Sequence, residues 1–183
     1  MVLNEVPPKP MTEPDNSTVH TARTPPETVL DDFFDTADPL SDPVPITSSV
    51  PWPGSTFIIR AASSGQVLTV LDGRVSLAPI GGPGSIHWAC VETKGWLGFR
   101  NVVSGRMLGH DGQKGRLRCS EEKHREWENF AVRLRPQGGY LLQMTHFERL
   151  WVVGRKVDQG GREVLAKMEG GKEGEIVWEF VKV

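Results

Sequence analysis

The stretch LGFRNVVSGRMLGHDGQKGRLRCSEEKHREW, residues 97–127, decides the fold of this 183-residue chain. It opens with alternating apolar residues, continues to Leu108, carries a Gly-Arg pair before a second alternating segment, and closes on Trp127. Two other stretches have the same order of features, FIIRAASSGQVLTVLDGRVSLAPIGGPGSIHW at 57–88 and YLLQMTHFERLWVVGRKVDQGGREVLAKMEGGKEGEIVW at 140–178. Self-similarity at a period of about 40 residues is the signature of a repeat architecture. We therefore predict three related structural units.

Each unit has three marked positions. A core residue follows the opening segment, at Leu68, Leu108 and Trp151. The Gly-Arg pairs are Gly73-Arg74, Gly115-Arg116 and Gly161-Arg162. The closing residues are Trp88, Trp127 and Trp178. We expect the three closing tryptophans to fill equivalent places in the core.

The apolar residues between the glycines follow a period of two. Segments 57–59, 97–99, 130–134, 140–144 and 176–180 place them at alternate positions, which puts them on one face of a strand. Hardly any stretch is long or regular enough for an amphipathic helix. The sequence therefore predicts an all-β domain. Three units are too few for a propeller, but three four-stranded units can close a barrel.

The stretches GRMLGHDGQKGRLRC at 105–119 and ENFAVRLRPQGGYLLQM at 128–144 resemble the repeats of fascin-type proteins. In those repeats a Gly-x-x-Leu strand is followed by a Gly-x-Leu-x-Cys strand. More broadly, residues 51–183 resemble the β-trefoil family, which includes ricin-B-type lectins, and they are similar to fungal single-trefoil proteins of unassigned function. The resemblance implies a six-stranded barrel capped by three hairpins. It also implies fascin-like protein interaction, with actin as one partner, or alternatively an intracellular carbohydrate-binding lectin.

Ricin-type sugar sites use an acidic residue just after the core aliphatic residue of an early strand, together with a Gln-x-Trp motif. The residues after the expected core positions are Thr69, Gly109 and Val152, and none of them carries a carboxylate. The residues two places before the closing tryptophans are Ile86, Arg125 and Ile176. A lectin of this sequence would therefore need a non-standard sugar site. Trp96 is an aromatic candidate for such a site, while Trp151 is expected in the core.

Charge divides the chain into two parts. Residues 1–50 hold nine of the fourteen prolines and nine acidic against two basic residues, whereas residues 51–183 carry a net charge of +5. We predict a disordered acidic arm at 1–50, because this composition cannot bury enough apolar area to offset the cost of ordering the chain. Within the arm, residues 28–36 could form a short docking helix. The residues that would share its apolar face are Leu30, Phe33 and Phe34. An arm that docks on nothing remains the alternative.

Paired arginines give the domain a basic surface. Arg116 and Arg118 alternate about Leu117, and Arg133 and Arg135 alternate about Leu134. Such a surface suits an acidic protein or the acidic arm, and nucleic acid is the least favoured partner because fourteen acidic residues are interspersed. The ligand-binding candidates are Arg116, Arg118, Arg133, Arg135, Trp96, Asp72, His110 and Asp111.

Catalytic and metal-binding patterns are missing from the sequence. There is no Gly-x-Ser-x-Gly motif, and His87 and Cys90 would point to opposite faces of one strand. We expect a protein that is not an enzyme and holds no cofactor or metal. No apolar run approaches the roughly 20 residues of a membrane span, and the first residues lack a secretory signal, which favours the cytoplasm. Cys90 and Cys119 are expected to be reduced and buried.

Overall fold

The computed structural model describes residues 48–112, 114–171 and 173–183. The strands are β1 (Thr56–Ala61), β2 (Val67–Leu71), β3 (Arg74–Ala78), β4 (His87–Thr93), β5 (Trp96–Asn101), β6 (Met107–His110), β7 (Leu117–Glu121), β8 (Phe130–Leu134), β9 (Tyr140–His146), β10 (Arg149–Val157), β11 (Glu163–Met168) and β12 (Trp178–Lys182). A short 3-10 helix, η1 (Glu126–Glu128), precedes β8. The predicted docking helix at 28–36, with Leu30, Phe33 and Phe34, lies outside the described residues.

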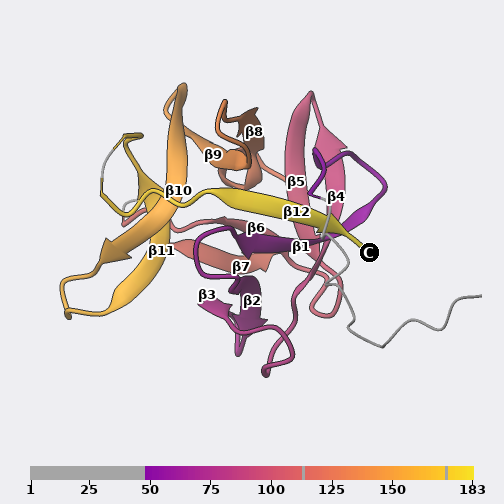
Figure 1. The fold of residues 1–183 in the computed structure, drawn as a ribbon. Helices are drawn as coiled ribbons and strands as arrows, with labels where there is room; N and C mark the ends of the chain where they lie inside the picture. The colour runs from indigo at the N-terminus through magenta and orange to yellow at the C-terminus, as the bar shows by residue number, and fades with distance from the viewer. Residues whose placement is uncertain (1–47, 113, 172) are drawn as a thin grey trace, which may run out of the picture. The chain divides into compact units, whose positions relative to one another are not determined.

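Six of the strands form a closed ring. β1 pairs with β4, β4 with β5, β5 with β8, β8 with β9, β9 with β12 and β12 with β1, all antiparallel. The other six strands form three hairpins, β2–β3, β6–β7 and β10–β11. Figure 1 shows β1 and β12 side by side, with the β2–β3 hairpin below them and the β10–β11 hairpin to their left. The all-β prediction is confirmed, and a barrel with three hairpins is the arrangement expected from the sequence.

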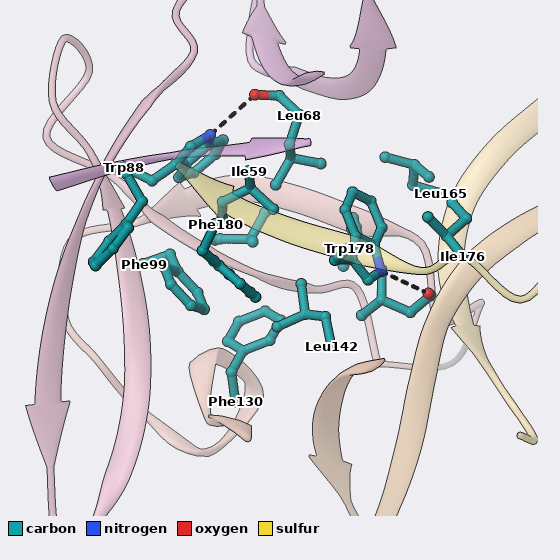
Figure 2. Close-up of a cluster of buried hydrophobic side chains, with 14 of the residues drawn as sticks. Ile59, Leu68, Trp88, Phe99, Phe130, Leu142, Leu165, Ile176, Trp178 and Phe180 are labelled. Atoms are coloured by element: carbon teal, nitrogen blue, oxygen red, sulfur yellow. Dashed lines mark hydrogen bonds between the residues drawn. The ribbon is translucent and has the colours of Figure 1, made fainter. Parts of the chain in front are cut away.

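The barrel interior is filled by apolar side chains from the ring strands. Two of the predicted closing tryptophans, Trp88 and Trp178, are fully buried there. Their indole N–H groups donate hydrogen bonds to main-chain oxygens, from Trp88 to Leu68 at 3.0 Å and from Trp178 to Val153 at 3.3 Å (Figure 2). A buried indole N–H needs such an acceptor, and both tryptophans find it on the second strand of their own unit.

The prediction for the third tryptophan is wrong. Trp127 is 43% exposed and lies in η1, outside the barrel. In the strand register, Phe130 pairs with Met144 of β9 just as Trp88 pairs with Asn101 of β5, and Phe130 is 1% exposed. Phe130 therefore fills the core position of this unit. Trp127 lies in η1, three residues before β8 begins, and so cannot reach that position.

The third core position also differs from the prediction. Val153 is fully buried, whereas Trp151 is only half-buried. The Val153 carbonyl accepts a hydrogen bond from the closing tryptophan of its unit, as the Leu68 carbonyl does in the first unit. The residue that follows the core position in this unit is therefore Gly154 and not Val152. A side chain at Gly154 would collide with Met168 and with the backbone of Gly174. No carboxylate stands at this position in any unit, so a ricin-type acidic residue is absent there.

The described domain begins before the predicted boundary at residue 51. Ser48 forms a bridge with Val181, and its hydroxyl accepts a hydrogen bond from the Phe180 N–H at 3.0 Å. The Ser49 N–H donates to the Phe180 carbonyl at 2.9 Å. These contacts extend the sheet beyond the outer edge of β12.

Both cysteines are buried and unpaired, as predicted. Cys90 is 1% exposed and Cys119 is 5% exposed. Burial, with the nearby Glu92 carboxylate as a second cause, raises the pKa of Cys90 to about 12. Burial also raises the pKa of Cys119. In the described part of the chain, no helix has the length and apolar character that a membrane span requires.

Candidate functional site at the hairpin tips

The arginines of the three Gly-Arg pairs line one pocket. Arg74, Arg116 and Arg162 come from the β2–β3, β6–β7 and β10–β11 hairpins, and the pocket between them has a volume of about 900 Å³. The hairpins are joined through backbone pairing of Arg74 with Arg118 and of Arg116 with Ala166. We call this site the hairpin-tip pocket. Its charged lining residues are Arg74, Arg116, Arg118, Arg162, Asp72, Asp111, Asp158 and Glu163.

Two of the hairpins use an aspartate to close their turn. The Asp111 Oδ1 atom accepts a hydrogen bond from the Arg116 backbone N–H at 3.0 Å, and the Asp158 Oδ1 atom accepts one from the Arg162 N–H at 3.0 Å. Asp158 also accepts from the Gly160 N–H, and its Oδ2 atom pairs with the guanidinium of Arg116 at 2.9 Å. The backbone N–H of Arg162 is the main cause that lowers the pKa of Asp158. Asp158 therefore stays ionised and holds Arg116 in the pocket wall.

The β2–β3 hairpin is shorter, and its aspartate is free. Leu71 pairs directly with Arg74, so the turn consists only of Asp72 and Gly73, with φ values of 49° and 73°. Asp-Gly is the preferred pair for a turn that needs two positive φ values. Among the described residues, neither the Asp72 carboxylate nor the Arg74 guanidinium has a hydrogen-bond or ion-pair partner. The pocket lining thus includes one free acceptor group and one free donor group.

The pocket balances its charges. It is lined by four arginines and four acidic residues, with apolar surface from Leu71, Val75, Leu77, Leu117, Val164 and Leu165. Two residues outside the lining pair with lining residues, Glu121 with Arg118 at 3.2 Å and Arg155 with Glu163 at 3.5 Å. The charges of these two outer residues also cancel each other. A small anion would meet the carboxylates of Asp72 and Asp111. A neutral ligand with many hydroxyl groups could use both the donors and the acceptors.

Four of the eight residues predicted as ligand-binding candidates meet in this pocket. They are Asp72, Asp111, Arg116 and Arg118. Sequence reasoning missed Arg74 and Arg162 as site residues, although it marked both in the Gly-Arg pairs. The repetition of the pair in all three units was the signal that could have found them.

Arg133, Arg135 and Trp96 lie elsewhere. Arg133 belongs to β8, Arg135 follows it, and neither lines the hairpin-tip pocket. Leu134 between them is 64% exposed, so the expected alternation about a buried leucine is wrong at this end of β8. Trp96 begins β5 next to the tight turn at 94–95 and is half-buried outside the pocket.

His110 is a structural residue and cannot contact a ligand directly. It is fully buried; its Nδ1 atom accepts from the Gly112 N–H at 2.9 Å, and its Nε2 atom therefore donates to the Thr145 carbonyl at 3.2 Å. Burial, with the Lys167 charge as a second cause, lowers the pKa of His110 to about 4. Its ring stacks on Trp127 with centroids 5.5 Å apart. The prediction of His110 as a ligand-binding residue is corrected accordingly.

No group of three or more histidine, cysteine or acidic side chains in the described residues is arranged to hold a metal ion. The charged groups that line the pocket are guanidinium and carboxylate groups.

No protein-family model matches the sequence, and no curated protein matches it significantly. Solved structures do match the fold. A ricin B-like lectin of Macrolepiota procera, solved in complex with lactose, aligns with a TM-score of 0.59 and 13% identity over 74% of this chain and 100% of its own. A GH43 β-1,3-galactosidase aligns with a TM-score of 0.59 and 15% identity over 73% of this chain. An exo-β-1,3-galactanase from Clostridium thermocellum aligns with a TM-score of 0.55 and 20% identity over 71% of this chain.

The alignments cover 28% of the galactosidase and 30% of the galactanase. This chain therefore corresponds to less than a third of either enzyme. At these identities the similarity establishes the fold alone, and that fold is the one of the ricin B-like lectin.

Proposed function

We propose that the described domain is a non-catalytic carbohydrate-binding module, a β-trefoil of three related units, and that the hairpin-tip pocket is its sugar site. The observation that carries the proposal is that the unpaired Asp72 carboxylate and the unpaired Arg74 guanidinium line the same pocket, whose charges balance. The lectin of the same fold was solved with lactose, and the two enzymes act on galactose-containing substrates. β-Galactosides are therefore the first ligands to test.

The chemistry of the pocket suits a sugar ring. Neighbouring hydroxyl groups of a sugar both donate and accept hydrogen bonds, so a carboxylate can accept from two of them while a guanidinium donates to others. Hydrogen bonds to charged groups are stronger than neutral ones, which favours sugar binding at a site that is open to water. The apolar lining residues can contact the C–H groups of the ring.

The fold similarities favour carbohydrate binding over the fascin-like protein interaction predicted from the stretch at 105–119. Neither actin binding nor a fungal source gains support from them. The basic surface expected to bind an acidic protein is also less basic than predicted, because Arg116 and Arg118 are paired with Asp158 and Glu121.

The absence of catalysis is part of the proposal. Since the matched region is a minor portion of each enzyme, their hydrolytic activity is not transferred to this chain. Incubation of the full chain with lactose should release no galactose. Release above the rate of a heat-inactivated sample would contradict the non-catalytic assignment.

A glycan array with the full chain tests the function, and three variants test the site. Asp72→Asn preserves the shape of the side chain and tolerates a positive φ, but it removes the charge. We expect Asp72→Asn and Arg74→Ala each to weaken binding to the best glycan by roughly ten- to a hundredfold, the usual effect of losing a charged hydrogen-bond partner. The matched control is Arg133→Ala, which removes an exposed arginine outside the pocket and should leave binding unchanged. Equal affinity in Arg74→Ala and the unmodified chain would rule out this site.

A further inference from the structure

We propose that Trp127 is a second sugar-contacting residue at the rim of the hairpin-tip pocket, so that the ligand is an oligosaccharide with one residue in the pocket and the next on the indole. This inference rests on the proposed function and adds the size of the ligand to it. It starts from a tryptophan that the repeat places in the core and the structure places on the surface.

Trp127 adjoins one residue of the pocket wall and the chain neighbour of another. The guanidinium carbon of Arg118 lies 5.5 Å from the centroid of its ring. On another side the ring packs over Gly112, the neighbour of Asp111, so closely that a Cβ atom on Gly112 would lie 3.1 Å from the indole. Gly112 also has a φ of 75°, which other residues rarely adopt. A glycine at this position lets the indole approach the pocket wall.

The indole is both exposed and supported. It is 43% exposed, and behind it the buried His110 ring stacks at an interplanar angle of 29°. His110 is itself held by hydrogen bonds through both ring nitrogens, at 2.9 Å and 3.2 Å. The tryptophan is therefore positioned before any ligand arrives, which reduces the entropy lost on binding. The exposed part of the indole can contact the positively polarised C–H groups of a sugar ring.

Arg118 connects the two subsites. It lines the pocket, lies over the Trp127 ring and makes one ion pair, with Glu121 at 3.2 Å. Its Nε atom is buried, but the side chain as a whole is 33% exposed. The guanidinium N–H groups that Glu121 does not use can therefore donate to a hydroxyl group of either sugar residue while the Glu121 contact keeps Arg118 in place.

The chain offers a matched control for Trp127. Trp52 is 41% exposed, nearly the same fraction, and it packs edge-on against Phe57 with centroids 5.4 Å apart. Lys182 lies 4.8 Å above its ring. Neither of these partners lines the hairpin-tip pocket. Removing the Trp52 ring therefore takes away a similar exposed indole without touching the proposed subsite.

The test is isothermal titration calorimetry of the full chain with galactose and with lactose. The unmodified chain should bind lactose roughly five- to tenfold more tightly than galactose, the ratio expected from one aromatic contact. Trp127→Ala should remove this preference while leaving the affinity for galactose unchanged. Trp127→Phe, which keeps a ring, should retain part of the preference, and Trp52→Ala should retain all of it.

Three outcomes overturn the inference while the proposed function stands, and the first two concern the preference for lactose. One is a full lactose preference in Trp127→Ala, and the other is an unmodified chain that binds both sugars equally. An equal loss of both sugars in Trp127→Ala, with an unchanged melting curve, would place the indole inside the first subsite and also contradict the inference. Failure of the proposed function looks different, because the unmodified chain would then bind neither sugar.

Discussion

The three tryptophans that close the repeat units in the sequence do not occupy equivalent positions in the structure. Trp88 and Trp178 are buried because their indole N–H groups reach main-chain oxygens of Leu68 and Val153. Trp127 stands at the close of the second unit, but Phe130 fills the barrel there. A phenylalanine needs no acceptor, so the second unit closes without that hydrogen bond.

Substitution by alanine separates the two kinds of tryptophan. Trp88→Ala, Trp178→Ala and Phe130→Ala should each lower the free energy of unfolding by about 3–5 kcal/mol, the usual cost of a large aromatic deletion in a core. Trp127→Ala should lower it by about 1 kcal/mol or less, because the ring is partly solvated. Urea denaturation measures all four. A Phe130→Ala loss no greater than that of Trp127→Ala would disprove the equivalence of Phe130 with the tryptophans.

His110 gives the stability of the domain a specific pH dependence. Its pKa is lowered to about 4 in the folded chain, while the unfolded chain keeps the usual value of about 6.5. The unfolded state therefore binds a proton that the folded state does not, and the free energy of unfolding should fall as pH drops from 6.5 to about 4. The full loss is roughly 3 kcal/mol, reached near pH 4 and absent above pH 6.5.

Urea denaturation at several pH values measures this slope. His110→Gln should flatten the slope, whereas His87→Gln, at an exposed position, should not. An imidazole titration by NMR that gave His110 an ordinary pKa would contradict the explanation.

At the scale of elements, the two-residue hairpin turns of the domain differ in how well their residues tolerate the positive φ values that these turns require. Asp72-Gly73 and Lys94-Gly95 supply glycine at the second turn position, and both turns have positive φ values. The β9–β10 hairpin also has a two-residue turn, since His146 pairs with Arg149. Its turn residues are Phe147 and Glu148, with φ values of 46° and 59°. A bulky side chain is strained in this region of backbone space.

Replacing Phe147-Glu148 by Asn-Gly should therefore stabilise the domain. Asn-Gly is the preferred pair for such a turn, and Phe147 is 86% exposed, so little packing is lost. We expect a gain of about 1 kcal/mol in the free energy of unfolding. A decrease on replacement would show that the Phe147 ring makes stabilising contacts that outweigh the backbone strain.

The hairpins also explain what the sequence could and could not predict. The period of two and the repeated Gly-Arg pairs were sufficient to predict an all-β domain of three related units, and the barrel with three hairpins followed from the resemblance to β-trefoils. They did not reveal that the arginines of those pairs converge, because Arg74, Arg116 and Arg162 are far apart in sequence and meet only when the hairpins pack. Asp72, Asp111, Arg116 and Arg118 were predicted individually, but no sequence feature grouped them.

The other wrong predictions, for His110, Trp151 and Trp127, have their cause in local geometry. His110 looks like a surface ligand beside Asp111, yet strand β6 turns its ring inward. Trp151 and Trp127 fit the repeat by spacing, but Val153 and Phe130 occupy the core because the second and third units carry extra residues between their strands. Such shifts of two or three residues bring a different side chain to the core position and cannot be read from spacing.

For the whole molecule, the start of the domain is a measurable boundary. Ser48 and Ser49 add hydrogen bonds to Phe180 at the edge of β12. A chain of residues 46–183 should therefore be more stable than one of residues 51–183 by about 1–3 kcal/mol, the contribution of two or three hydrogen bonds. Thermal and urea unfolding of the two chains measures the difference. Identical stability would show that the strand edge ends at Pro51.

The central claim is that the hairpin-tip pocket binds sugar, and an NMR titration of the full ¹⁵N-labelled chain with lactose tests it most directly. The account predicts concentration-dependent shifts of the amide signals of Asp72, Gly73, Arg74 and Arg116, with the signals of Arg133 and Trp96 unmoved. Lactose that shifts the Arg133 or Trp96 signals and leaves those of the hairpin tips in place would contradict the claim, and so would a spectrum that lactose leaves unchanged.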